Sequence, residues 1–149
     1  IVYIDMDKVL NESNAGLMAT NELTEKHKGN IKYFQSTEDQ LKEEEKDLLS
    51  KKNVIKREEF QEKIETLRKK AQDYQKERKL KIDEITNKRS EARQIILNAA
   101  QPILTNYIKI NQISLIIDKK NIVIGKKDLE ITDAIIDELN KKLPSINLN

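Results

Sequence analysis

A charged stretch in the middle of the chain decides the fold: residues 38–70 read EDQLKEEEKDLLSKKNVIKREEFQEKIETLRKK. Between residues 38 and 93, 17 side chains are Lys or Arg and 15 are Asp or Glu, out of 56. That leaves too few apolar side chains to cover a face of a β-sheet. A coiled coil of two helices needs only a narrow apolar seam. The stretch therefore predicts long, solvated helices.

Apolar residues repeat with helical spacing on both sides of this stretch, from about residue 11 to about residue 110. In the first half a line recurs every seven residues and is widened by three neighbours: His27, Phe34, Leu41, Leu48 and Ile55, with Leu23, Ile31 and Leu49 beside them. In the second half the steps alternate between four and three: Phe60, Ile64, Leu67, Ala71 and Tyr74, then Ile85, Ala92, Ile95 and Ala99. Arg78, Lys81 and Lys88 occupy the places between, so we expect an interrupted seam that loosens the arms there.

The chain is expected to turn back within residues 50–57 (SKKNVIKR), which hold Ser and Asn near the middle of the helical region. One unbroken helix is the alternative, but a hairpin brings the two ends of the helical region together. The turn gathers four basic residues: Lys51, Lys52, Lys56 and Arg57. They are candidate contacts for a client protein or anionic lipid, and a merely solvated helix end remains the alternative.

Strand patterns flank the helical region. Residues 1–5 (IVYID) predict one strand, residues 113–118 a second and residues 122–124 a third. Thr132 is expected to be the N-cap of a last helix with an apolar stripe: Ile135, Ile136, Leu139 and Leu143. We therefore expect an α+β fold, with a body of residues 1–10 and 103–149 and a helical hairpin arm of residues 11–102.

The body is too small to hold a stable core alone, and a three-stranded sheet leaves its edges open. We therefore expect a homo-oligomer. The formal net charge of +2 gives no case for nucleic-acid binding. The chain has no cysteine, and no acidic or histidine cluster has metal-ligand spacing, so no cofactor is expected. His27, the single histidine, is expected to lie in the helical seam.

One local motif suggests catalysis. In IVYIDMDKVL, Asp5-x-Asp7 follows four apolar residues and resembles the first motif of haloacid-dehalogenase phosphatases. There Asp5 would be the nucleophile, Asp7 the acid/base and Mg²⁺ the cofactor. That fold needs several more parallel strands, whereas the next hundred residues are charged helix. We therefore expect a strand end followed by a helix start, and no enzyme.

The order of strand, long hairpin, strands and helix resembles the Skp/OmpH family of periplasmic chaperones. The resemblance is carried by IVYIDMDKVLNES at one end, by Pro102-Ile103-Leu104, and by ISLIIDKKNIVIGKKDLEITDAIIDELNKKL at the other. It implies a trimer whose bodies join in a β-barrel and whose hairpins surround a cavity.

The resemblance also implies a function. Such a protein would hold unfolded outer-membrane proteins without ATP and would work in the periplasm, after removal of a signal peptide. The basic turn, apart from the resemblance, is the expected place of peripheral contact with anionic lipid. A structural coiled-coil scaffold that binds a folded partner is the alternative.

Overall fold

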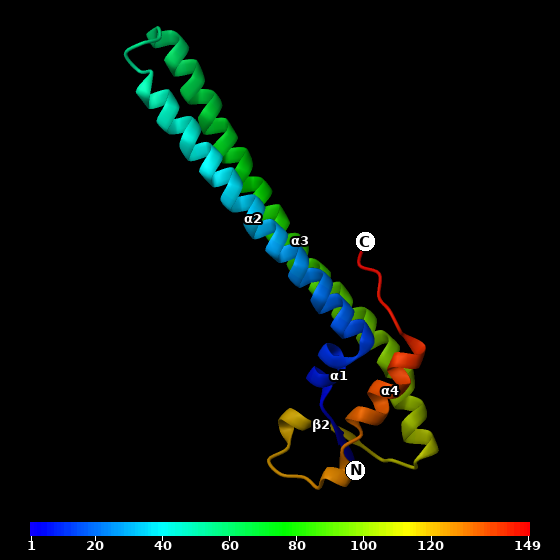
Figure 1. Cartoon of the computed structure of the whole chain (residues 1–149). Coiled ribbons are helices and arrows are strands. Elements are labelled where there is room, and N and C mark those ends of the chain that lie inside the picture. Colours follow the sequence, from blue (N-terminus) through cyan, green and yellow to red (C-terminus); the bar gives the residue numbers. More distant parts are fainter. The chain divides into compact units, whose positions relative to one another are not determined.

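The structure, a computed structural model, describes all 149 residues of the chain (Figure 1). In chain order its elements are β1 (Val2–Ile4), α1 (Met6–Glu12), α2 (Asn14–Ser50), α3 (Arg57–Ile110), β2 (Ile116–Asp118), the 3₁₀ turns η1 (Lys119–Asn121) and η2 (Lys127–Leu129), and α4 (Thr132–Lys142). The expected combination of long helices with a small strand-containing part is confirmed. No helix has the length and apolar composition needed to span a bilayer.

The chain forms two compact units. The first unit holds Ile1–Thr24 and Asn87–Asn149, and the second unit holds Glu25–Thr86. The first unit is larger than the expected body of residues 1–10 and 103–149, because it also includes one end of α2 and part of α3. The reason is that Ala19 of α2 and Ala92 of α3 are buried in the same core as Ile4 and Leu139.

The sheet of the first unit has two parallel strands, with Val2 opposite Ile116 and Ile4 opposite Asp118. The third strand expected at residues 122–124 is wrong. These residues follow the turn η1 as irregular chain, and Val123 and Ile124 are 102% and 91% exposed. A strand needs a hydrogen-bonded partner for its backbone groups, and residues 122–124 form no backbone hydrogen bond with β1 or β2.

A corner between α1 and α2 interrupts the helix expected from residue 11 onward. The hydroxyl of Ser13 accepts a hydrogen bond from the Gly16 amide at 3.2 Å, and its carbonyl accepts one from Leu17 at 2.8 Å. Ser13 is therefore the N-cap of α2. Gly16 lies so close to α1 that a Cβ atom there would overlap the carbonyl oxygen of Leu10.

The apolar face of α4 lies in the core of the first unit. Ile135, Ile136 and Leu139 are buried, and Leu143 packs against them half-buried, as the sequence pattern predicts.

Thr132 is the first residue of α4, so its expected place as N-cap is wrong, and Ile131 holds that position. The Thr132 hydroxyl instead accepts a hydrogen bond from the Asp5 amide at 2.9 Å and donates one to Glu130 at 3.1 Å. Thr132 therefore ties α4 to the end of β1.

In the second unit α2 and α3 run antiparallel. Residue numbers in α3 fall as those in α2 rise along three polar contacts: Lys26–Glu84 at 2.5 Å, Tyr33–Glu77 at 2.9 Å and Glu44–Lys70 at 3.0 Å. Because α2 ends at Ser50 and α3 begins at Arg57, the hairpin is confirmed over a single unbroken helix.

The seam between these helices differs from the expected one on α2. Phe34 and Leu48 are buried, but His27 is exposed, so its predicted place in the seam is wrong. Ile31 and Leu49 are also exposed. Asn30 lies in the seam, seven residues from the buried Leu23, and its side-chain nitrogen has no hydrogen-bond partner. The seven-residue spacing of apolar side chains does not predict that Asn30 is buried, because Asn30 is polar.

Candidate functional site

The turn between α2 and α3 brings together the four basic residues singled out from the sequence. Backbone amides of Val54 and Ile55 donate to the Lys51 carbonyl at 3.0 and 3.2 Å, which closes the turn. The Lys51 ammonium pairs with Asp47 at 3.0 Å.

The other three basic residues of this turn, Lys52, Lys56 and Arg57, make no ion pair or side-chain hydrogen bond. Val54 is 80% exposed in their midst. The turn therefore presents unpaired positive charge together with an apolar side chain, a combination suited to an anionic surface with an apolar interior.

Aromatic and charged side chains pack together in the second unit, in the region where the sequence predicts an interrupted seam. We call them the aromatic cluster: Tyr33, Phe34, Tyr74, Arg78 and Lys81. The Arg78 guanidinium lies 5.4 Å from the centre of the Phe34 ring, and the Lys81 ammonium lies 5.0 Å from that of Tyr33. Phe34 packs edge-on against Tyr74 at 6.3 Å. Arg78 and Lys81 therefore add contacts between the helices where the pattern suggests a gap.

The tyrosines of the aromatic cluster donate to carboxylates. The Tyr74 hydroxyl donates to Glu38 at 2.7 Å, and Arg78 pairs with the same carboxylate at 3.3 Å. Burial first, and then this hydrogen bond, raises the pKa of Tyr74 to about 12. The hydrogen bond from Tyr33 to Glu77 raises the pKa of Tyr33 as well. Both phenols thus act as neutral hydrogen-bond donors at physiological pH.

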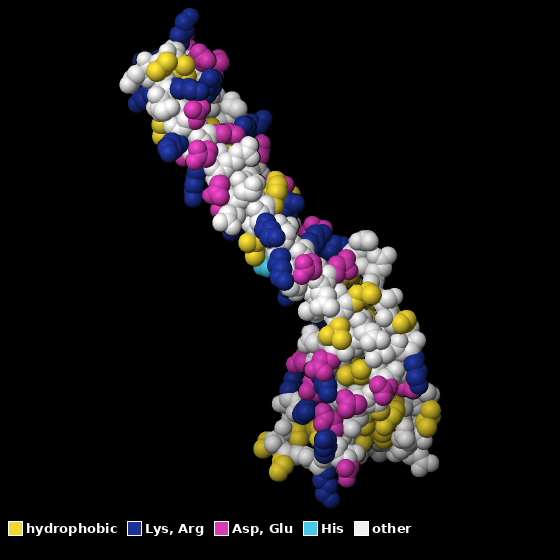
Figure 2. All heavy atoms as spheres, in the orientation of Figure 1, with side chains coloured by type: hydrophobic (Ala, Val, Ile, Leu, Met, Phe, Trp, Pro, Cys, Tyr) yellow, Lys and Arg dark blue, Asp and Glu magenta, His cyan; other side chains and the backbone are white.

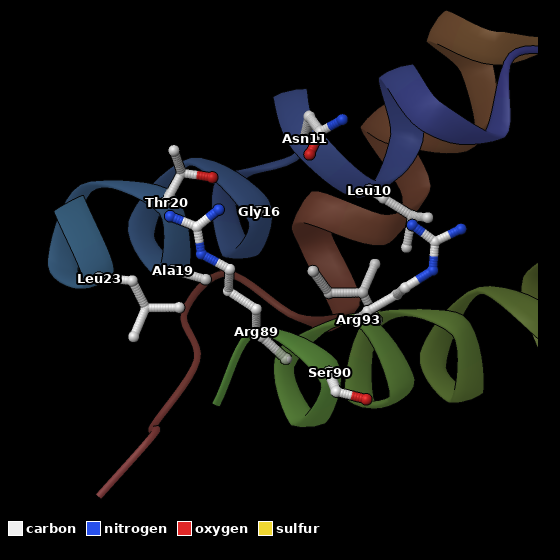
Figure 3. Close-up of a pocket in the computed structure, with 11 residues that line it drawn as sticks. Leu10, Asn11, Gly16, Ala19, Thr20, Leu23, Arg89, Ser90 and Arg93 are labelled. Atoms are coloured by element: carbon white, nitrogen blue, oxygen red, sulfur yellow. The ribbon is translucent and has the colours of Figure 1, made fainter. Parts of the chain in front are cut away.

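A pocket of about 360 Å³ lies among α1, α2 and α3 in the first unit (Figure 3). Its lining is mainly apolar, with Leu10, Ala19 and Leu23 among its members, and the side chains of Arg89 and Arg93 project from α3 beside it. Neither arginine makes an ion pair. The sequence pattern gave no signal for this pocket, because it depends on the corner at Ser13.

Exposed apolar side chains interrupt the charged surface of the second unit. Six large ones are more than 40% exposed: Ile31, Tyr33, Leu49, Val54, Leu80 and Ile82. Figure 2 shows basic and acidic side chains mixed along both helices, with isolated apolar side chains between them. Ile31 and Leu49 lie five helical turns apart, so they face the same side of α2. The surface can thus offer apolar contacts without forming one large patch.

The fold and these surfaces agree with a match to a known protein family. The family model described as "Outer membrane protein (OmpH-like)" matches residues 1–139. The chain belongs to the OmpH-like family. No curated protein matches it.

One solved structure similar to this OmpH-like chain is that of a candidate outer membrane chaperone, also described as OmpH-like, from Caulobacter crescentus CB15. The TM-score is 0.89, with 17% sequence identity, over 98% of this chain and 86% of the other. At that identity the similarity establishes the shared fold.

In this OmpH-like chain the Asp5-x-Asp7 motif lies at the start of a helix, as expected for a strand end that is followed by a helix. The Asp5 carboxylate accepts a hydrogen bond from the Lys8 amide at 3.0 Å and is the N-cap of α1, while Asp7 is exposed. β1 has one partner strand, not the several parallel strands of the phosphatase fold. No group of three acidic, histidine or cysteine residues gathers at metal-binding distance.

Proposed function

We propose that this OmpH-like chain is a chaperone that holds unfolded outer-membrane proteins in a cavity between helical arms and prevents their aggregation without ATP. The observation that carries the proposal is the set of exposed apolar side chains on the charged helices of the second unit. Membership of the OmpH-like family supports the chaperone role, and so does the fold shared with the Caulobacter candidate chaperone. The proposal places the protein in the periplasm, which outer-membrane proteins cross unfolded.

The physical argument rests on many weak contacts. Full burial of one large aliphatic side chain contributes about 1.5–3 kcal/mol, and a half-exposed residue can contribute only part of that. An unfolded client also loses entropy when it is ordered, which lowers the affinity of each contact. Several separated apolar residues can therefore shield a client without trapping it, while the surrounding charges keep the chaperone soluble.

Replacing two of these apolar residues is expected to weaken protection of a client. Ile31→Lys/Leu49→Lys removes two contacts on one side of α2 that are 49% and 53% exposed, so the chain's own stability should change little. In a turbidity assay, a urea-denatured outer-membrane β-barrel protein is diluted into buffer with the wild type or the variant. We expect the wild type to suppress aggregation in molar excess and the variant to need several times more protein.

The matched control makes the same change in net charge but leaves Ile31 and Leu49 in place. Gln35→Lys/Gln40→Lys adds the same two positive charges at exposed positions of α2 and should protect as the wild type does. If the wild type leaves turbidity unchanged in molar excess, the chaperone proposal is rejected and a coiled-coil scaffold for a folded partner takes its place. If both double variants lose protection alike, added charge and not lost apolar contact is the cause.

We further propose that the protein works as a trimer whose first units join their sheets into a small β-barrel. The two-stranded sheet has open edges along β2 and along β1 beyond its one bridge from Tyr3 to Glu130, and exposed apolar residues gather around it: Ile1, Ile110, Leu115, Val123, Ile124 and Leu129. Figure 2 shows apolar side chains at the surface of the first unit, at the loop after the strands and to one side of a group of charged side chains. Sheets joined between subunits would pair these edges and cover the side chains.

For the turn between α2 and α3, we propose contact with anionic lipid through Lys51, Lys52, Lys56 and Arg57. Each basic residue near an anionic membrane contributes about 1 kcal/mol. Only Lys51 already has an ion-pair partner, so changing all four to Gln should weaken vesicle binding about a hundredfold or more. Sedimentation with vesicles of phosphatidylcholine and phosphatidylglycerol measures this.

The control for lipid binding replaces four exposed and unpaired lysines elsewhere on the helices: Lys42→Gln, Lys69→Gln, Lys76→Gln and Lys79→Gln. It should retain binding. Equal loss in both variants would mean that general charge attracts the vesicles. No binding by the wild type would reject the lipid proposal and leave acidic client segments as the partner of this turn.

A further inference from the structure

Residues 144–149, which we call the C-terminal segment, follow α4 as an extended chain. The segment has no backbone hydrogen bonds to a strand. Ile146 and Leu148 are nevertheless buried, at 8% and 1% exposure, within the core of the first unit, while Asn147 and Asn149 between and after them are exposed. The family match ends at residue 139 and does not include this segment.

Few polar contacts hold the segment. The Ile146 amide donates to the sulfur of Met18 on α2 at 3.5 Å, and the Lys88 ammonium on α3 donates to the Leu148 carbonyl. Lys88 is one of the residues that the sequence pattern marks as interrupting the seam. Its contact with the segment gives that interruption a role, because an aliphatic side chain could not bind a backbone carbonyl.

The segment is therefore held by two kinds of contact. Two apolar side chains at alternate positions enter the core, and a cation binds a backbone carbonyl that any sequence carries. Alternate burial is the pattern of an extended strand, in which successive side chains point to opposite faces. Transmembrane β-strands also alternate apolar and polar residues.

We propose that the surface beside Met18 and Lys88 that receives the segment is a binding site for extended polypeptide with apolar residues at alternate positions, and that the C-terminal segment occupies it until such a peptide displaces it. This inference rests on the proposed chaperone function, which makes a segment of an unfolded client the natural peptide. The segment is suited to displacement because one lysine, one weak contact to sulfur and two side chains hold it, with no strand ladder.

The chain's lack of cysteine allows a direct test in the whole protein. Leu148→Cys places a single thiol at the buried position, and Asn147→Cys places one at the neighbouring exposed position. A maleimide reagent should label the first at least about tenfold more slowly than the second, because the buried thiol reacts only when the segment opens.

The probe is a synthetic peptide that repeats the order Ser-Ile-Asn-Leu between flanking lysines. It should raise the labelling rate of Leu148→Cys several-fold, toward that of Asn147→Cys, whose own rate should not change. An isomer of the same composition with its apolar residues grouped together should leave both rates unchanged. Ile146→Cys repeats the measurement at the other buried position, in case the change at Leu148 disturbs packing.

The results separate this inference from the chaperone proposal. If Leu148→Cys and Ile146→Cys label as fast as Asn147→Cys without peptide, or if the alternating peptide leaves their slow rates unchanged, the binding site is rejected. Suppressed turbidity with unchanged rates would overturn this inference alone. Faster labelling with turbidity not suppressed would keep this surface as a peptide site and reject the chaperone function.

Discussion

Val123→Lys/Ile124→Lys is expected to break the proposed trimer into monomers. Both side chains are almost entirely exposed in the single chain, and the proposal buries them between subunits. Losing that burial costs about 1.5–3 kcal/mol for each side chain, and each lysine adds a charge that must be desolvated or expelled. The dissociation constant should therefore rise by a hundredfold or more. Size-exclusion chromatography with light scattering at micromolar concentration measures the mass directly.

A second variant separates lost apolar contact from added charge in this assembly test. Asn121→Lys/Asp128→Asn changes the net charge by the same amount at exposed polar positions of the same loop, and it should remain assembled. A monomeric, stably folded wild type would reject the trimer. A Val123→Lys/Ile124→Lys variant that keeps the wild-type mass would show that the subunits meet elsewhere.

Gly16→Ala is expected to destabilise the first unit strongly. The added Cβ atom would overlap the Leu10 carbonyl, which belongs to the backbone of α1 and cannot rotate away. Either α1 must shift or the cap at Ser13 must open, and strain of this kind costs about 1–3 kcal/mol or more. Urea unfolding followed by circular dichroism should show a lower midpoint than the wild type.

Gly29→Ala is the matched control within the same helix. Nothing lies within 4 Å of a Cβ atom built there. Alanine is favoured over glycine inside a helix by about 0.5–1 kcal/mol, so this variant should be slightly more stable than the wild type. If the two alanine variants unfold at the same midpoint, the close approach at Gly16 does not constrain the corner between α1 and α2.

The sequence predicts the helices well because charge density and seven-residue spacing are properties of the local chain. The turn is found for the same reason: Ser50 and Asn53 interrupt good helix formers, and the helices do end at Ser50 and begin again at Arg57. The apolar stripe of α4 repeats with helical period, so Ile135 and Leu139 could be assigned to a core before their partners were known.

The errors lie where a residue's place depends on a distant partner. Residues 122–124 have strand-forming side chains, but a strand also needs to pair with an edge, and in this chain they do not pair with the free edge of β2. His27 keeps the spacing of the seam, yet Asn30 is the residue buried there, because position on the helix and not polarity decides which side chain faces α3. The sequence pattern does not predict the aromatic cluster, because Arg78 and Lys81 contact aromatic rings on the other helix, α2.

The pairing of Val2 with Ile116 has a consequence for how the protein is made. A sheet between residues so far apart in sequence cannot form while the chain is still being synthesised through α3. Closing such a long loop is slow when the intervening chain is disordered. If α2 and α3 pair first next to the turn and the pairing then extends along them, β1 and β2 are brought close together, and the loop to be closed becomes shorter. The charged hairpin would then bring together the two strands of its own chain before the protein takes up its proposed chaperone function.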